Sequence, residues 1–237
     1  MSETKVFEAS PEAKGQAKQL RLFAMLAWIL AMAGQAFAIF KLISDETLIW
    51  LIVAIVVILI LAITGSTLWK KANRLDPASE KDTTRFFIQN QLGAIMGVLA
   101  FLPLVVLILT NKNISGQTKG IAGSIAAIAM VAAGITGADF NPPSVEKYTQ
   151  EINQQNQEAK SLSINSDNVY WSKAGNKYHA YDNCQYIKGK ALSSGSIKES
   201  WEQKGISELC KVCKKKAAKS SVIPNVKEKE RELIKNE

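Results

Sequence analysis

The sequence predicts an α-helical membrane protein in which four transmembrane helices are followed by a small α+β zinc-binding domain. Two observations carry this prediction. Residues 20–138 contain four long apolar runs, whereas residues 141–237 are polar and charged. The only histidine and the three cysteines of the chain all lie in the polar half, between His179 and Cys213.

Each apolar run approaches the roughly 20 residues that a helix needs to cross a bilayer. The four runs are Leu22–Phe40, Leu48–Leu68, Leu92–Leu109 and Ile121–Gly137, and none contains Asp, Glu, Lys or Arg. A core helix of a soluble protein would be shorter and would show a polar face. We therefore assign residues 22–138 to a four-helix transmembrane domain, preceded by an N-terminal segment of residues 1–21.

Lysine and arginine in the connecting segments predict the orientation, because cytoplasmic loops carry an excess of these residues. Residues 1–21 contain four, residues 41–47 one, residues 70–85 five and residues 110–120 two. This alternation predicts a multi-pass protein of the bacterial cytoplasmic (inner) membrane, with both termini in the cytoplasm.

The segment Gln35-Ala36-Phe37-Ala38 resembles a signal-peptidase site, so cleavage is an alternative for the first run. The 21-residue polar lead and the apolar Ile39-Phe40 after the motif argue against it. Cleavage would leave the other three helices, and the side of the polar half, unchanged. A cytoplasmic polar half lies in a reducing compartment, which favours metal binding over disulfides.

Small residues recur at intervals of four in the third and fourth runs, as Gly93 and Gly97 and as Ala129, Ala133 and Gly137. Such ridges let helix backbones approach closely. They predict packing within the chain or a homo-oligomer of several copies.

The apolar half contains few polar groups that a transporter would use. Gln35 is the only amide well inside a run, and Pro103 is predicted to kink the third helix. Transport usually needs ionisable groups or broken helices at membrane depth. A small transporter or channel component therefore remains the alternative function, without residues that support it.

Residues 139–168 are predicted to form a linker with a short helix. Ser144 can cap a helix, and Val145, Tyr148 and Ile152 recur at helical spacing on one face. The Gln-, Asn- and Glu-rich composition that follows is typical of a linker.

Residues 169–219 have the local signals of a small mixed domain, and residues 220–237 form a charged tail. Val169–Ser172 and Lys177–Ala180 are predicted to pair as a hairpin, with a further strand near residues 190–193. Ser196-Ile197-Lys198-Glu199 is a capping box that opens a helix, and Gly205 can end this helix.

The spacing His179-x4-Cys184-x25-Cys210-x2-Cys213 is typical of a structural zinc site, in which two close pairs of ligands supply four tetrahedral bonds. The alternatives are buried free thiols with a hydrogen-bonded histidine, or a disulfide. We favour Zn²⁺ because all four residues lie outside the long apolar half. A domain this small buries little core, so metal binding is expected to supply much of its folding free energy.

Five segments also carry a family resemblance: Val169-Tyr170-Trp171-Ser172, Lys177-Tyr178-His179, Cys184-Gln185-Tyr186-Ile187-Lys188, the helix from Glu199 to Gly205, and Cys210-Lys211-Val212-Cys213. Over about 45 to 50 residues they resemble the small zinc domain related to the metal-binding domain of the Ada DNA-repair protein. Similar modules are appended to bacterial secreted nucleases and DNA-uptake proteins. The four-helix half is not part of this resemblance.

The resemblance implies a fold and a metal rather than an activity. In the Ada domain all four ligands are cysteines and the first accepts a methyl group, whereas His179 occupies that position here. An imidazole cannot act as the thiolate acceptor. Four protein ligands also leave no open position for a catalytic water, so we expect no enzyme activity. Asp182, which can contact the imidazole, is expected to be a solvated loop residue.

Charge indicates the kind of partner. Residues 169–219 contain 11 Lys and 4 Asp or Glu. The possible polyanion-binding lysines crowd the second cysteine pair: Lys211, Lys214, Lys215, Lys216 and Lys219. With nearby aromatic rings they can bind nucleic acid, and they can equally bind anionic lipid. Alternatively, the lysines only solvate the domain and the aromatic rings form its core.

We therefore predict an integral membrane protein that tethers a cytoplasmic structural-zinc domain. This domain is expected to act as a binding or regulatory module, for nucleic acid or for a protein partner. The transporter alternative would assign the zinc domain a structural or regulatory role only.

Overall fold

The computed structural model describes residues 6–206 and 208–219 and separates the chain into two compact units. One unit comprises Lys14–Ser144. The other joins the N-terminal residues up to Ala13 with the residues from Val145 onward. The charged tail predicted over residues 220–237 lies outside the described residues.

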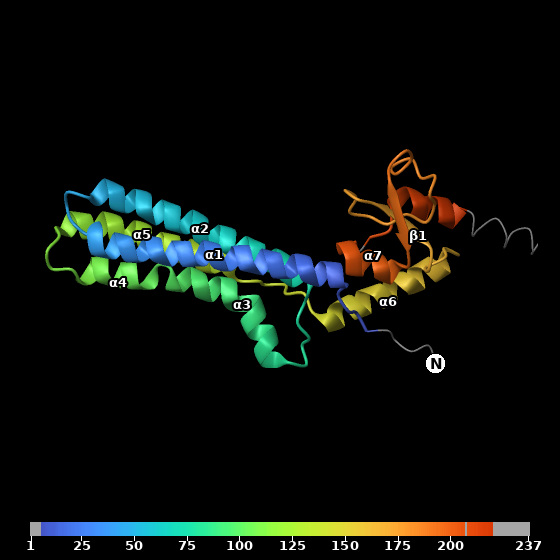
Figure 1. Cartoon of the computed structure of the whole chain (residues 1–237), viewed down its shortest axis with the longest axis horizontal. Helices are drawn as coiled ribbons and strands as arrows, with labels where there is room; N and C mark the ends of the chain where they lie inside the picture. The colour runs from blue at the N-terminus through green and yellow to red at the C-terminus, as the bar shows by residue number, and fades with distance from the viewer. Residues whose placement is uncertain (1–5, 207, 220–237) are drawn as a thin grey trace, which may run out of the picture. The chain divides into compact units, whose positions relative to one another are not determined.

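The structure confirms four helices that are long and apolar enough to cross a membrane (Figure 1). They are α1 (Pro11–Lys41), α2 (Leu48–Leu75), the pair α3 (Thr83–Leu99) and α4 (Leu102–Thr110), and α5 (Gly116–Gly137). Large apolar side chains cover their outer faces, as expected where lipid replaces water. By length and composition this is a multi-pass membrane protein.

The third span is divided into α3 and α4 rather than merely kinked. Pro103 lies in the first turn of α4, and Phe101 caps that helix with a non-helical φ of −128°. Proline lacks an N–H and its ring collides with the carbonyl four residues earlier, so it kinks or breaks a helix, and here the regular helix is interrupted at residues 100–101. The proline thus sets the start of α4.

Helix α5 packs against α2, α3 and α4. A side chain at Gly97 would place its Cβ 2.8 Å from the carbonyl oxygen of Ala133, and one at Gly93 would place it 2.7 Å from that of Gly137. The two backbones therefore touch where the sequence has small residues. The predicted packing role of these ridges is confirmed within the chain.

Polar side chains tie together one end of the helices in this unit. The Trp69 indole and the Asn73 amide both donate hydrogen bonds of 2.7 Å to the Gln89 carbonyl. The Gln89 amide in turn donates to the Asp76 carbonyl at 3.0 Å. Arg21 of α1 forms an ion pair of 2.9 Å with the Asp76 carboxylate. These polar groups therefore hold helix ends together.

The second unit contains α6 (Val145–Ser161), β1 (Val169–Ser172), β2 (Leu192–Gly195) and α7 (Ile197–Lys204), and residues 211–219 are helical. The two strands are antiparallel, with Val169 opposite Gly195 and Ser172 opposite Leu192. Figure 1 labels β1, α6 and α7.

This unit is larger than the segment of residues 169–219 delimited from the sequence. The helix predicted after Ser144 extends to Ser161, and Ile152 and Ala159 are buried in the core of the unit. N-terminal residues join the same core. The ring of Tyr148 lies between Phe7, at 5.1 Å, and Trp201, at 4.7 Å between centroids. An apolar helix face that packs in this way behaves as part of a domain rather than as a linker.

The predicted hairpin of β1 with residues 177–180 is formed only in part. The strand that pairs with β1 along its whole length is β2. Tyr178 bridges to Leu209, and the antiparallel pairing of this segment with β1 is limited to one bridge between Tyr170 and His179. Pairing stops there because the chain turns at Tyr181, whose carbonyl accepts a hydrogen bond from the N–H of Cys184. Residues 178 and 179 are therefore held by β1 on one side and by Leu209 on the other, although they do not form a strand.

The local signals for α7 are confirmed. The Ser196 hydroxyl accepts a hydrogen bond from the N–H of Glu199, and the Glu199 carboxylate accepts one from the N–H of Ser196. Gly205 ends the helix in the left-handed conformation, with φ +62°, which glycine adopts without strain. Strand β2 begins at Leu192, close to the predicted position.

Candidate metal centre

Two backbone bridges bring the predicted ligands together. Tyr170 and His179 exchange N–H to carbonyl hydrogen bonds of 2.8 and 2.7 Å, which anchors the histidine to β1. Tyr178 bonds on its other side to Glu208 and Cys210, both at 2.9 Å. The second cysteine pair is thereby placed beside the histidine.

The two cysteines of the second pair stand at the start of the helical residues 211–219. Positions i and i+3 face the same side of a helix, so Cys210 and Cys213 point to one centre. Cys184 reaches this centre from a separate turn, in which its carbonyl accepts hydrogen bonds from the N–H groups of Ile187 and Lys188, both at 2.9 Å.

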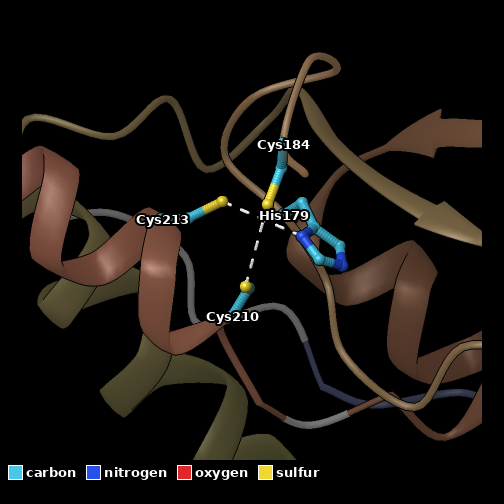
Figure 2. Close-up of side chains that lie close together, drawn as sticks. All are labelled: His179, Cys184, Cys210 and Cys213. Carbon is cyan, nitrogen blue, oxygen red and sulfur yellow. Dashed lines mark hydrogen bonds between the residues drawn. The ribbon is translucent and has the colours of Figure 1, made fainter. Parts of the chain in front are cut away.

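All four predicted ligands converge on one point (Figure 2). The Nδ1 of His179 and the sulfurs of Cys184, Cys210 and Cys213 lie within 4.8 Å of one another, and all four residues are buried. The Cys184 and Cys210 sulfurs are 3.9 Å apart, and the Cys213 sulfur is 3.8 Å from the His179 Nδ1.

These separations suit a tetrahedral ion. Bonds of about 2.3 Å from Zn²⁺ to sulfur and about 2.0 Å to nitrogen place neighbouring tetrahedral ligands about 3.5 to 3.8 Å apart. A disulfide would require sulfurs about 2.05 Å apart. The three cysteines are free, so a disulfide does not account for the cluster. A nitrogen and three sulfurs in this arrangement can hold a metal ion and form a donor set typical of zinc.

Burial keeps Cys213 protonated and His179 neutral when no cation is bound. Burial raises the pKa of the Cys213 thiol to about 12, and the neighbouring Cys184 and Cys210 act in the same direction against a hydrogen bond from the Ala180 backbone. Burial lowers the pKa of His179, and the positive charge of Lys190 lowers it further. The imidazole is therefore neutral, which is the form that binds a metal. A bound cation would stabilise the thiolates that the protein alone disfavours.

Asp182 is exposed in the turn between His179 and Cys184 and is not one of the four converging residues. The aromatic residues near the metal centre differ in burial. Trp171 and Tyr178 are buried in the core, Tyr170 and Tyr181 are partly buried against it, and Tyr186 is exposed. The interpretation of the aromatic side chains as core residues therefore holds for all of these except Tyr186.

The five predicted polyanion-binding lysines differ in their contacts. Lys214 forms an ion pair with Glu158 of α6, and the Lys216 ammonium lies 4.3 Å from the centre of the Tyr181 ring. The remaining three stand at i, i+4 and i+8 on the helical residues 211–219, and so they share one face. We call this face the lysine stripe: Lys211, Lys215 and Lys219.

Two further lysines near the metal centre are not among the predicted site residues. Lys177 and Lys190 line a cavity together with Lys211. Neither lysine belongs to a run of basic residues, so the charge pattern of the sequence does not mark them. Their only local signal is their position beside the ligands, two residues before His179 and six after Cys184.

Comparisons of this chain with protein-family models, with curated proteins and with solved structures find no match.

Proposed function

We propose that this membrane protein holds one structural Zn²⁺ through His179, Cys184, Cys210 and Cys213, and that the resulting module binds a polyanion. Nucleic acid is the partner that we favour, and both termini are assigned to the cytoplasm. The observation that carries the proposal is the closed cluster of four buried ligands with a stripe of exposed lysines immediately after it.

Zinc in this proposal has a structural role. Four protein ligands leave no position for a water molecule, so the module is assigned no catalytic activity. The histidine in the first ligand position also argues against methyl transfer of the Ada type. What zinc supplies when bound is a crosslink between the turn of Cys184, the bridge at His179 and the start of the last described helix.

The lysine stripe supports binding of phosphate groups. Lys211, Lys215 and Lys219 are exposed and form no ion pair with any described residue. Lysines that contact phosphates release condensed counterions, which makes binding depend on salt. Contacts to phosphate carry no sequence information, so the proposed binding is weakly specific in sequence.

The alternative is a transporter component, which would need polar groups along a cavity in the helical unit. The groove between α1 and α2 is instead lined by apolar residues such as Leu30, Phe37 and Val57. We therefore develop the binding module, and a role for a protein partner becomes an outcome of its test.

The test measures binding of a fluorescent single-stranded DNA to the full-length, zinc-loaded protein over a salt series. Replacing Lys215 and Lys219 with Gln should weaken binding and flatten the log-log salt slope by about 0.7 per lost contact. Replacing Lys173 and Lys188, which are equally exposed, is the charge-matched control and should have a smaller effect. Equal effects of the two double variants, or no binding at all, would overturn the nucleic-acid proposal and favour a protein partner.

A further inference from the structure

A cavity of about 360 Å³ lies beside the metal centre in the C-terminal unit. His179 and Cys210 form part of its wall, so the same residues that hold the metal also define the cavity. Its volume is near the lower end of the usual range for ligand pockets, about 300 to 1,000 Å³, and suits one compact ligand.

The charge of the cavity selects an anion. Lys177, Lys190 and Lys211 line it, and no Asp or Glu is among its lining residues. Glu208 lies close by, forms an ion pair with Lys177, and also interacts electrostatically with Lys211. One carboxylate thus offsets part of the charge of three lysines, and the cavity keeps a net positive charge for a ligand.

The backbone fixes neutral donors and a lysine around this space. The N–H of Gly175 donates a hydrogen bond of 3.0 Å to the Ser172 carbonyl, which closes the turn that carries Ser172 and Asn176 at the cavity wall. A second turn, which follows Cys184, ends at Gly189. Its φ of +77° is a conformation that favours glycine, and Lys190 follows directly. A hydroxyl, an amide and ammonium groups are the donors that bind phosphate oxygens.

An aromatic ring completes the wall. Tyr186 lines the cavity and is 58 % exposed, and it is the only aromatic side chain of the exposed class among the described residues of this unit. The ring of Tyr181, in contrast, is covered by Lys216. An exposed flat ring next to ammonium groups is the combination on which unpaired bases stack while their phosphates are neutralised.

We propose that this cavity binds one nucleotide of a single strand, with its phosphate toward Lys177, Lys190 and Lys211 and its base on the ring of Tyr186. The proposal rests on the proposed function and extends it from the lysine stripe to a defined site. An unpaired nucleotide is required because a base in a duplex does not expose its face to a side chain. The lysine stripe continues from Lys211 and would then contact neighbouring phosphates of the same strand.

The experiment measures equilibrium binding of adenosine 5′-monophosphate, adenosine and inorganic phosphate to the full-length, zinc-loaded protein. The nucleotide should bind more tightly than either part alone. Lys190→Gln should weaken nucleotide binding by about tenfold, the effect of losing one charge-assisted contact. Tyr186→Ala should weaken it by about fivefold or more and leave phosphate binding unchanged, whereas Tyr186→Phe should bind normally.

Two controls keep the result interpretable. Lys188→Gln removes a nearby exposed charge that does not line the cavity and should leave nucleotide binding unchanged. Every variant should retain one equivalent of zinc, which excludes loss of the fold.

Phosphate that binds as tightly as the nucleotide, together with a silent Tyr186→Ala, would overturn the nucleotide site. No nucleotide binding would also overturn it, even where single-stranded DNA binds through Lys215 and Lys219 and the proposed function stands. If neither nucleotide nor DNA binds, both proposals fail.

Discussion

Loss of one zinc ligand should unfold the C-terminal unit while leaving the helical unit intact. Cys213→Ser replaces a buried sulfur by a hydroxyl, which is a poor ligand for zinc, and Cys213 is itself part of the core of this unit. The prediction follows because metal binding is expected to supply much of the folding free energy of so small a unit, in addition to the backbone bridges at Tyr178 and His179.

The size of the effect can be estimated from linkage. Free zinc at a thousandfold excess over its dissociation constant stabilises a folded unit by about 4.1 kcal/mol. For a unit of about 60 to 100 residues, 1 kcal/mol shifts Tm by roughly 4 to 8 °C. A strong chelator should therefore lower the Tm of this unit by about 15 to 30 °C, and Cys213→Ser should do the same without chelator.

Thiol labelling is the suitable assay, because Cys184, Cys210 and Cys213 are the only cysteines of the chain and report this unit alone. Labelling as a function of temperature gives the Tm, and a metallochromic indicator counts the zinc released. Asp182→Asn is the control. This exposed residue lies between His179 and Cys184 in the sequence but is not one of the four metal ligands, so the variant should behave as the wild type. Purified protein without zinc, or thiols whose reactivity is indifferent to chelator, would refute the metal centre.

Four further predictions concern the rest of the chain. Ser44→Cys should react with an impermeant reagent outside intact cells and Lys81→Cys should not; the opposite pattern would invert the topology. Gly137→Ala should destabilise the helical unit in detergent by about 1 to 3 kcal/mol, because its Cβ would meet the Gly93 backbone, whereas Gly120→Ala in the same helix meets nothing within 4 Å and should be neutral. Trp201→Ala should cost the C-terminal unit about 3 to 5 kcal/mol in denaturant titrations, and a loss below about 1 kcal/mol would contradict its place in the core. Acidification should release zinc, since thiols bind protons as the metal leaves, and release that increases with rising pH would contradict this.

The membrane helices and the cap of α7 could be predicted because their signals are local. An apolar run without charges can be recognised without knowing its neighbours, and the capping box at Ser196 lies within four residues. The pairing of β1 was predicted only in part because a short strand carries no signal for its partner. Val169–Ser172 pairs along its whole length with Leu192–Gly195, some 20 residues away, whereas the expected partner contributes a single bridge from His179 to Tyr170.

The sequence by itself therefore determined the four spans and the four candidate metal ligands, since both depend on residue type and spacing along the chain. Only the tertiary structure decided which groups share a surface. In the folded chain, buried residues of α6 share a core with Phe7, and Lys214 forms an ion pair with Glu158. Lys177 and Lys190 line the same cavity as Lys211. The physical reason is that burial and charge pairing act between side chains close in space, and a chain of this length brings together residues that no local pattern relates.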